Sequence, residues 1–317
     1  MKNKITRRRF IASTAAATAA VSASAFNIIQ NGSHDGTRIC IFSKHLQFLD
    51  YHEMADTIAE IGFDGADLTV RPGGHILPEN VEQDLPVALE ALKSRGLAVP
   101  MITTALTDPD DPLTTRILKT AGELGIHYYR MGYFRYDEEK EIEETILDLR
   151  SNIAGLVELN KNFNLHGAYQ NHAGDYLGAP VWDLWMLIGG FEPDYIGCQY
   201  DIRHATVEGG TSWPLGLKLL QPYIRTIVVK DFKWEKINEK WEIIDVPLGE
   251  GMVDWDLFFR FLKELGFSGP ISIHVEYHLF DEKDTTLSKN HKKKITIENI
   301  RRDLTFLKTK LTETELI

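Results

Sequence analysis

The sequence Ile196-Gly-Cys-Gln-Tyr-Asp-Ile-Arg-His204 predicts a buried parallel strand that ends in a polar tip, Asp201 to His204. A carboxylate and an imidazole three residues apart, where an apolar strand gives way to a loop, contribute little to packing. At least five other predicted strands end in a similar cluster of charged or amide side chains. Parallel strands that close into a barrel gather such tips into one mouth. The stretch therefore favours a barrel with a single polar site.

On both sides of this stretch the chain repeats one unit: a short β-branched run, a polar tip and an amphipathic helix. The other strands are predicted at residues 38–43, 66–70, 98–105, 127–131, 167–170, 225–229 and 270–278. Helices are predicted at residues 50–60, 81–94, 113–124, 137–160, 181–188, 214–220 and 255–265, and from about 289 onward. Residues 234–244 are predicted to form an inserted hairpin that turns at Asn238.

Eight strands alternating with helices predict an α/β fold, a (β/α)8 TIM barrel in one domain spanning residues 38–317. A doubly wound sheet is the alternative. No Gly-x-Gly-x-x-Gly turn follows the first strand and no Walker-type phosphate loop occurs, which argues against that alternative. Cys40 and Cys198 fall in strands that lie far apart around such a barrel, so we expect two buried free thiols.

The composition is that of a globular protein, with 43% hydrophobic and 26% charged residues and a net charge of -11. The acidic balance argues against nucleic acid and anionic membrane surfaces as partners, and a neutral small molecule is unaffected by it. We find no apolar segment long enough to span a membrane. The sequence leaves the oligomeric state open.

Residues 1–25 are predicted to be a twin-arginine signal peptide, followed by a linker at residues 26–37. Thr6-Arg-Arg-Arg-Phe-Ile11 carries the arginine pattern, and Ala23-Ser-Ala25 offers a small-residue cleavage site after a mildly apolar run. A disordered basic tail is the alternative. We therefore expect an exported, periplasmic protein. Unphosphorylated glycans are expected as substrates in that compartment rather than sugar phosphates.

Alternation along a strand decides which tip residues share a face. His274 and Glu276 lie two residues apart and are expected to point together into the mouth, or, alternatively, against the helices as a satisfied polar pair. Gln170 and His172 pair in the same way, and Lys230 follows the seventh strand. For Lys230 a surface ion pair with the next residue is the alternative.

Further tip residues have the donors, acceptors and aromatic faces that carbohydrate sites need. For His45, Arg71, His75 and His172 an ordinary loop role is the alternative, and for Asp201 and His204 the alternative is a capped turn. The residues expected to bind substrate are Lys44, His45, Arg71, His75, Tyr133 and His204.

Four segments carry a resemblance to a known family: the Asp201-x-x-His204 tip, Lys230-Asp231, Leu248-Gly-Glu-Gly-x-x-Asp254-Trp255 and Gly269-Pro-Ile-Ser-Ile-His-x-Glu276. Over roughly residues 38–310 the chain resembles the xylose-isomerase-like TIM-barrel family of sugar isomerases and epimerases. That family typically binds a divalent metal through Glu, Asp, His and Glu on strands five to eight. Asp201 matches this pattern, whereas the other three positions hold Gln170, Val228 and His274.

The resemblance implies an enzyme that enolises a sugar or keto-sugar by removing a proton next to a carbonyl. Glu276 is the expected base, Lys230 is expected to polarise the carbonyl, and His172 is the expected acid, with His204 as its alternative. A 3-keto-glycoside lyase or hydrolase is one alternative, because Gln170 cannot serve as a second base. A non-catalytic sugar-binding barrel that has lost its metal is another.

The expected cofactor is one divalent metal, Mn, Zn or Mg, held in a rearranged site by Asp201, His274 and Gln170. A metal-free site is the alternative. The expected partner is a small-molecule carbohydrate, and the acidic helix predicted at residues 137–160 is the one hint of a protein partner.

Overall fold

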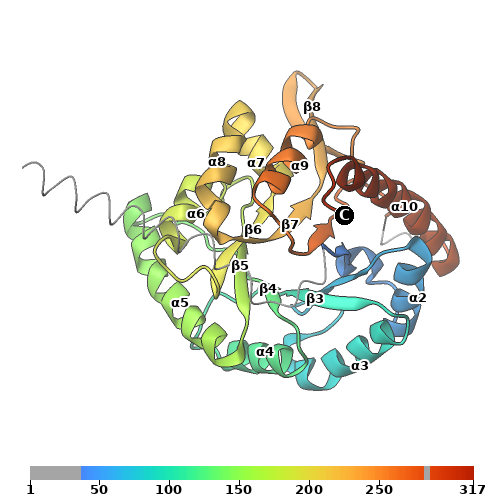
Figure 1. The fold of residues 1–317 in the computed structure, drawn as a ribbon, viewed down its shortest axis with the longest axis horizontal. Coiled ribbons are helices and arrows are strands. Elements are labelled where there is room, and N and C mark those ends of the chain that lie inside the picture. Colours follow the sequence, from blue (N-terminus) through green and yellow to red (C-terminus); the bar gives the residue numbers. More distant parts are fainter. Residues whose placement is uncertain (1–36, 282–285) are drawn as a thin grey trace, which may run out of the picture. The chain divides into compact units, whose positions relative to one another are not determined.

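The computed structural model describes residues 37–281 and 286–317. Within them eight parallel strands close into a barrel in the order β1-β10-β7-β6-β5-β4-β3-β2 (Figure 1). The barrel strands are β1 (Ile39–Phe42), β2 (Gly65–Thr69), β3 (Ala98–Thr103), β4 (Tyr128–Arg130), β5 (His166–Gln170), β6 (Ile196–Asp201), β7 (Ile224–Val229) and β10 (Ile271–Ile273). The predicted (β/α)8 barrel is confirmed. The predicted signal peptide and all of the linker except Thr37 lie outside the described residues.

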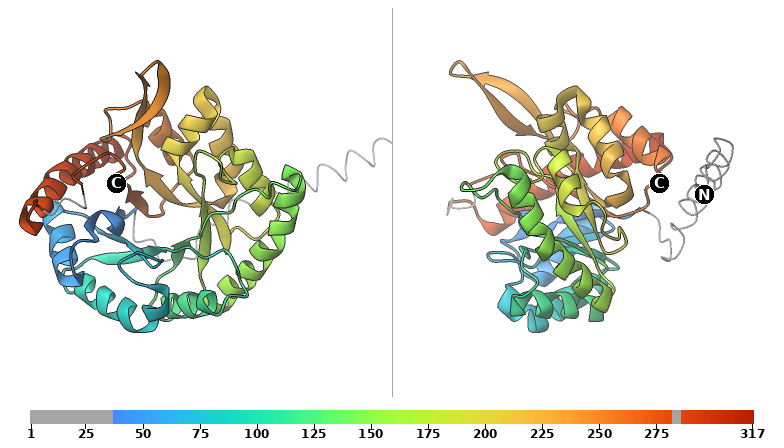
Figure 2. Two further views of the ribbon diagram at one scale, coloured as in Figure 1. Left: turned by 180° about the vertical axis from the view of Figure 1, so that it is seen from behind. Right: turned by 90° about the vertical axis from the view of Figure 1, so that its left-hand side faces the viewer.

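Helices fill the connections and surround the barrel (Figures 1 and 2). Each long helix is amphipathic and buries one apolar face, as α9 does with Trp255, Phe258, Phe259 and Leu262. The α-helices among the described residues are α2 (Tyr51–Ile61), α3 (Val81–Lys93), α4 (Pro112–Glu123), α5 (Ile142–Phe163), α6 (Val181–Ile188), α7 (Ile202–Gly209), α8 (Trp213–Leu220), α9 (Trp255–Glu264) and α10 (Lys289–Glu313).

Local sequence signals fix several helix ends. The Asp50 carboxylate accepts the Glu53 N–H at 2.9 Å, and the Glu53 carboxylate accepts the Asp50 N–H at 3.1 Å. This capping box confirms the predicted start of α2. Gly62 ends the helix with a φ of 101°, a conformation that costs residues with a Cβ more than it costs glycine.

Several predicted element ends differ from the structure. Helix α5 begins at Ile142 instead of Asp137, because Glu141 is still extended and precedes the first helical turn. Strand β10 ends at Ile273, well short of residue 278, although the next residue still donates its N–H to the Val229 carbonyl at 3.1 Å. The tip after β6 is no open loop, because Asp201 caps helix α7 directly.

The predicted hairpin is present as β8 (Asp231–Ile237) and β9 (Lys240–Val246), and it turns at Asn238 as expected. Asn238 and Glu239 have φ angles of 49° and 65°. Two consecutive positive φ values match the twist of a tight antiparallel hairpin, and asparagine tolerates them well. The hairpin rises out of the rim of the barrel, as the right-hand view of Figure 2 shows.

Polar side chains line the barrel interior below the mouth. The buried Asp67 carboxylate accepts hydrogen bonds from the Thr103 hydroxyl at 2.8 Å and the Ser272 hydroxyl at 2.9 Å. Burial raises the pKa of Asp67 to about 6, although these hydrogen bonds oppose the shift. Cys40 and Cys198 are buried free thiols, as predicted. Among the described helices none is long and apolar enough to span a membrane.

Candidate active site

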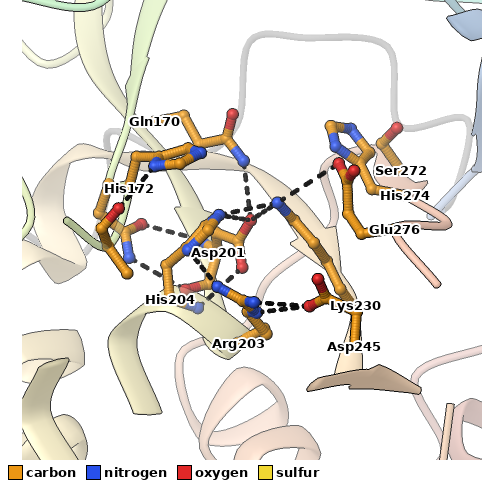
Figure 3. A network of polar contacts seen from close by, with 12 residues as sticks. Gln170, His172, Asp201, Arg203, His204, Lys230, Asp245, Ser272, His274 and Glu276 are labelled. Carbon is orange, nitrogen blue, oxygen red and sulfur yellow. Dashed lines mark hydrogen bonds and ion pairs between the residues drawn. The ribbon is translucent and has the colours of Figure 1, made fainter. Parts of the chain in front are cut away.

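The Lys230 ammonium lies between Asp201, at the end of β6, and Glu276, which follows β10 (Figure 3). Its Nζ is 3.1 Å from Oδ2 of Asp201, 3.9 Å from Oε1 of Glu276 and 2.8 Å from Nε2 of His204. The Lys230 side chain is only 5% exposed. An ammonium removed from water at a cost of several kcal/mol persists only when it is well paired, and two carboxylates provide that pairing here. These four predicted site residues are therefore brought together.

Asp201 is held rigidly at the end of β6. Its Oδ1 accepts the His204 backbone N–H at 3.1 Å, and its Oδ2 accepts the Gln170 Nε2–H at 2.7 Å. Asn171 clamps the Asp201 backbone by accepting its N–H at 2.8 Å and donating to its carbonyl at 3.0 Å. The Asp201 side chain is fully buried, and the Lys230 ammonium is its charged partner.

Gln170 connects this carboxylate to the wall formed by β4. Its Oε1 accepts the Tyr133 hydroxyl at 2.6 Å and a proton of Arg130 Nη1 at 3.3 Å, which orients the amide with Nε2 towards Asp201. Arg130 also donates to the Tyr133 oxygen at 2.7 Å. Burial raises the pKa of the Tyr133 hydroxyl, although Arg130 opposes this shift. Tyr133 therefore enters the site as a neutral donor.

Glu276 stands beside Lys230 and is also contacted by Lys44, whose Nζ is 3.4 Å from Oε2. Burial raises the pKa of Glu276, but the charges of Lys230 and Lys44 outweigh it and bring the pKa to about 2. The carboxylate is consequently ionised at neutral pH and able to accept a proton. It is the most accessible acidic group of the central cluster, with 30% of its side chain exposed.

Two predicted imidazoles, His45 and His274, lie close to Glu276. His45 Nε2 accepts the Val275 backbone N–H at 2.8 Å, so this ring nitrogen is occupied. His274 stacks on Phe42 with ring centroids 4.1 Å apart, and its Nε2 faces the Asp67 carboxylate at 3.5 Å. Burial lowers the pKa of His45 to about 4 and that of His274 well below its ordinary value, so both rings are neutral at pH 7.

His172 lies on the opposite side of Lys230 from Glu276 (Figure 3). Its ring packs against the rings of His204, with centroids 4.0 Å apart, and of Tyr133, with centroids 5.0 Å apart. Its Nδ1 contacts the carbonyl of the next residue at 2.9 Å, and Nε2 makes no hydrogen bond with the described part of the chain. Burial, reinforced by the Lys230 charge, lowers the pKa of His172.

The two remaining predicted residues follow β2. Arg71 places its guanidinium over the Phe42 ring, 5.3 Å from the centroid, at the edge of the mouth. His75 contacts the Leu46 carbonyl through Nε2 at 3.1 Å and the Ser43 hydroxyl through Nδ1 at 3.2 Å. Both ring nitrogens of His75 are thus used to join the loops after β1 and β2, which leaves none for a substrate.

The predicted Lys230-Asp231 tip splits in two, because neighbouring residues face opposite ways. Asp231 is buried outside the mouth, where its carboxylate accepts hydrogen bonds from Gly249, Gly251, Val253 and Phe232 backbone N–H groups and from Trp255 Nε1 at 2.9 Å. It anchors the segment that leads into α9. The surface ion pair that was the alternative for Lys230 is excluded, since both side chains are buried and point apart.

Sequence reasoning missed Arg203 and Asp245 of this network, as it missed Arg130 beside Gln170. Arg203 lies between the two tip residues Asp201 and His204, and it binds Asp245 of β9 through Nε at 3.0 Å and Nη2 at 2.6 Å (Figure 3). Asp245 is a single acidic residue near the end of a hairpin. Only the pairing of β8 with β9 brings it back to the mouth, and no local signal in the sequence marks it.

The sequence model of the xylose isomerase-like TIM barrel family matches residues 55–309 of the chain. The chain belongs to this family. No curated protein sequence matches it.

Solved structures of the same fold include three sugar enzymes. L-ribulose 3-epimerase superposes with a TM-score of 0.65, at 14% identity over 88% of this chain and 96% of that one. D-allulose 3-epimerase from Methylomonas sp. gives a TM-score of 0.62, at 14% identity over 87% and 97%. The 3-keto-D-glucoside 4-epimerase from E. coli gives 0.62, at 14% identity over 86% and 99%. At these identities the likeness establishes the shared barrel.

This member of the xylose isomerase-like family does not arrange its predicted metal ligands around one point. Asp201 faces the Gln170 amide nitrogen and the Lys230 ammonium, and His274 faces Asp67. Amide N–H groups and ammonium ions cannot act as ligands. Within residues 37–281 and 286–317 no group of three or more His, Cys, Asp or Glu side chains is placed to hold a metal ion. The predicted set of Asp201, His274 and Gln170 therefore does not fit a divalent cation.

Proposed function

We propose that this protein is an enzyme of the isomerase and epimerase type that removes a proton next to the carbonyl of a sugar or keto-sugar. The observation that carries the proposal is the position of Lys230, a buried cation 3.9 Å from the Glu276 carboxylate and open to the same mouth. Enolisation needs both groups at once, a base beside the C–H bond and positive charge beside the carbonyl oxygen.

Lys230 supplies the electrophilic half of this chemistry. Its ammonium is held by Asp201, so it donates to a carbonyl oxygen from a fixed position and needs no reorganisation as negative charge develops there. Glu276 supplies the base. The Glu276 carboxylate, ionised beside Lys230, is placed to take the proton next to that carbonyl.

A sugar is the substrate class that the rest of the mouth supports. Lys44 and Arg71 supply charged donors, and Tyr133 and His172 supply aromatic or imidazole faces, which matches the hydroxyl groups and ring faces of a carbohydrate. The solved structures with the same barrel include epimerases of L-ribulose, D-allulose and 3-keto-D-glucoside. The charge balance of the chain favours an uncharged sugar over a phosphorylated one.

Elimination from a 3-keto-glycoside is the second candidate, favoured by the placement of one carboxylate base and one imidazole on opposite sides of Lys230. Glu276 takes the proton from C2, the electron pair forms the enolate of the C3 ketone, and the C1–O bond then breaks. Neutral His172 keeps its proton on Nδ1 against the Ala173 carbonyl, so the proton for the departing oxygen comes from the imidazolium form, through Nε2, and that oxygen leaves as an alcohol. Gln170 occupies the place of a second carboxylate base, which two-base epimerisation requires.

Solvent deuterium exchange tests the proposal. We expect proton NMR in D2O to show loss of a carbon-bound proton next to the carbonyl for at least one member of a panel of ketoses and 3-keto-glycosides. Glu276→Gln and Lys230→Met each abolish exchange, whereas Glu60→Gln, on the exposed side of α2, keeps the wild-type rate. Release of alcohol identifies elimination, and a new sugar isomer identifies epimerisation. Sugar binding without exchange by the wild type would instead identify a non-catalytic binding barrel and refute the proposal.

We also propose that the enzyme acts after export to the periplasm. The support is the twin-arginine pattern of residues 6–11, which lies outside the described residues. Cell fractionation of the full-length chain and of an Arg7→Lys/Arg8→Lys/Arg9→Lys variant tests this proposal. Periplasmic recovery of the first and cytoplasmic retention of the second are expected, and equal distribution of both contradicts it.

A further inference from the structure

The two faces of the hairpin formed by β8 and β9 differ in chemistry. Side chains alternate along each strand, and register partners share a face. One face carries the charged side chains of Lys233, Glu235, Lys240 and Glu242. The opposite face, which we call the aromatic face, consists of Phe232, Trp234, Lys236, Trp241, Ile243 and Asp245.

The aromatic face continues the wall of the active site. At its base Asp245 accepts two N–H groups of Arg203, and the Phe232 ring centroid lies 5.5 Å from the Arg203 Cζ. Arg203 Nη1 in turn lies 3.0 Å from Nδ1 of His204, in the central cluster. Farther along the hairpin the Trp234 ring meets the Phe232 ring edge-on, with centroids 6.5 Å apart. An unbroken line of contacts therefore joins the centre of the mouth to the hairpin.

The outer half of the aromatic face is open to solvent. Trp234 is 40% exposed and Trp241 is 65% exposed. Trp234 pairs with Ile243 and Lys236 pairs with Trp241, so the two tryptophans are diagonal neighbours, about 7–8 Å apart. Met252, whose sulfur lies 3.4 Å from the Trp234 backbone nitrogen, is 55% exposed beside them. Large apolar rings side by side in water mark a ligand-binding surface or an interface.

The size of this surface favours a small ligand over a protein. A tryptophan side chain presents at most about 250 Å². At their exposures the two indoles therefore offer on the order of 250 Å², whereas a stable protein interface takes about 800 Å² from each partner. Two copies of this chain, each with a net charge of -11, would also repel each other. A flat indole instead matches the apolar face that the C–H bonds of a sugar ring form, and Lys236 supplies a donor for hydroxyl groups.

We propose that Trp234 and Trp241 form a second sugar subsite, which binds a further ring of a glycan chain whose first unit occupies the mouth. Trp234 lies four residues beyond Lys230, about 13 Å along an extended chain, which one sugar ring does not span. The substrate is then an oligosaccharide or its keto form, and a free monosaccharide leaves the subsite empty. Turnover of that substrate rests on the proposed function, whereas binding of a glycan chain does not.

Isothermal titration calorimetry of the full chain tests the subsite without any need for turnover. The panel holds glucose, galactose, mannose and xylose as monosaccharides and as chains of two to four units, with and without a 3-keto group. We expect at least one chain to bind about tenfold or more tighter than its monosaccharide. Trp241→Ala loses part of this preference, and Trp234→Ala/Trp241→Ala loses all of it while its affinity for the monosaccharide stays unchanged. Trp185→Ala, at a tryptophan that is 42% exposed on α6, is the matched control and keeps the wild-type values.

Three outcomes of the titration overturn the proposal. They are equal affinity of the wild type for chains and monosaccharides, binding of no member of the panel, and a chain preference that survives in the double variant. Gel filtration covers the competing occupant. A wild-type dimer that becomes a monomer in Trp234→Ala/Trp241→Ala would assign the aromatic face to a second copy of the chain and overturn the sugar subsite.

Deuterium exchange separates this proposal from the proposed function. A contact remote from the reacting carbon binds substrate and transition state alike. We therefore expect the double variant to raise KM for a chain by about tenfold or more and to leave kcat unchanged. If chains bind more tightly than monosaccharides but none undergoes exchange, the proposed function fails and the subsite stands. If exchange occurs and the double variant keeps the wild-type KM for chains, the subsite is refuted and the proposed function stands.

Discussion

Replacement of Lys230 by methionine tests how far the site depends on its internal cation. The Lys230–Asp201 contact is 3.1 Å long, with side chains 5% and 0% exposed. At an effective dielectric constant of about 20, two unit charges at this distance attract each other by about 5 kcal/mol. Removing one partner of a buried pair typically costs about 3–5 kcal/mol, because the other charge stays buried without compensation. We therefore expect Lys230→Met to lower the free energy of unfolding by about 3–5 kcal/mol.

A double-mutant cycle isolates the pair from the other donors to Asp201. Urea denaturation at pH 7, followed by circular dichroism, gives the free energy of unfolding of the wild type, Lys230→Met, Asp201→Asn and the double variant. Gln170 and the His204 N–H also stabilise the carboxylate, so the coupling energy is expected to be about 3 kcal/mol, below the full Coulomb energy. Additive losses, with a coupling energy under about 1 kcal/mol, would refute the claim that Lys230 is the counter-ion of Asp201.

Two further predictions concern residues outside the mouth. Asp231→Asn replaces Oδ2 by an amide nitrogen and leaves two backbone N–H groups and the Trp255 Nε1–H unpaired, so urea denaturation should show a loss of about 3–5 kcal/mol. Asp254→Asn is the control, because the Asp254 carboxylate accepts a single backbone N–H, that of Leu257. Equal losses of stability in the two variants would contradict the role given to Asp231. Burial lowers the pKa of His166 to about 3, so between pH 3 and 6.5 the unfolded chain binds the additional proton and stability falls as the pH falls. Between pH 7 and pH 5 the protonation of His166 in the unfolded chain lowers the free energy of unfolding by about 2 kcal/mol. His166→Gln should lack this part of the pH dependence, and a urea midpoint that depends on pH as in the wild type would show that His166 does not cause it.

The barrel was predictable because each repeat carries its own local signals. A β-branched run, a polar tip and a helix with an apolar face recur eight times, and parallel strands joined by helices have few ways to close. The errors fell where local pattern and tertiary contacts disagree. Residues 274–278 continue the alternation of the eighth strand, yet the register pairs of β10 with β1 and β7 end at Ile273, and His274 adds one backbone hydrogen bond to Val229 before the chain leaves the sheet.

The central residues of the site could be predicted from the sequence, whereas the contacts that link them to other residues could not. Strand ends gave Asp201, Lys230 and Glu276, since all parallel strands deliver their last residues to one mouth. The contact of His274 with Asp67 could not be predicted, because Asp67 lies on a strand that is distant in sequence and carries no pattern that marks it as a partner. A ligand pattern read along single strands cannot reveal that an ammonium occupies the space between the donors.

The hairpin leaves the barrel immediately after Lys230, and it returns at Val246, the register partner of Asp231. Its two ends are therefore clamped side by side, and the barrel places no constraint on how long the arm between them is. Residues 234–243 are therefore a site where the hairpin can change in length or sequence. Such a change alters the surface above the mouth, while the pairing of Asp231 with Val246 keeps Asp245 in place. A change in the length of this arm therefore leaves Lys230 and Asp231, at the base of the hairpin, where they are.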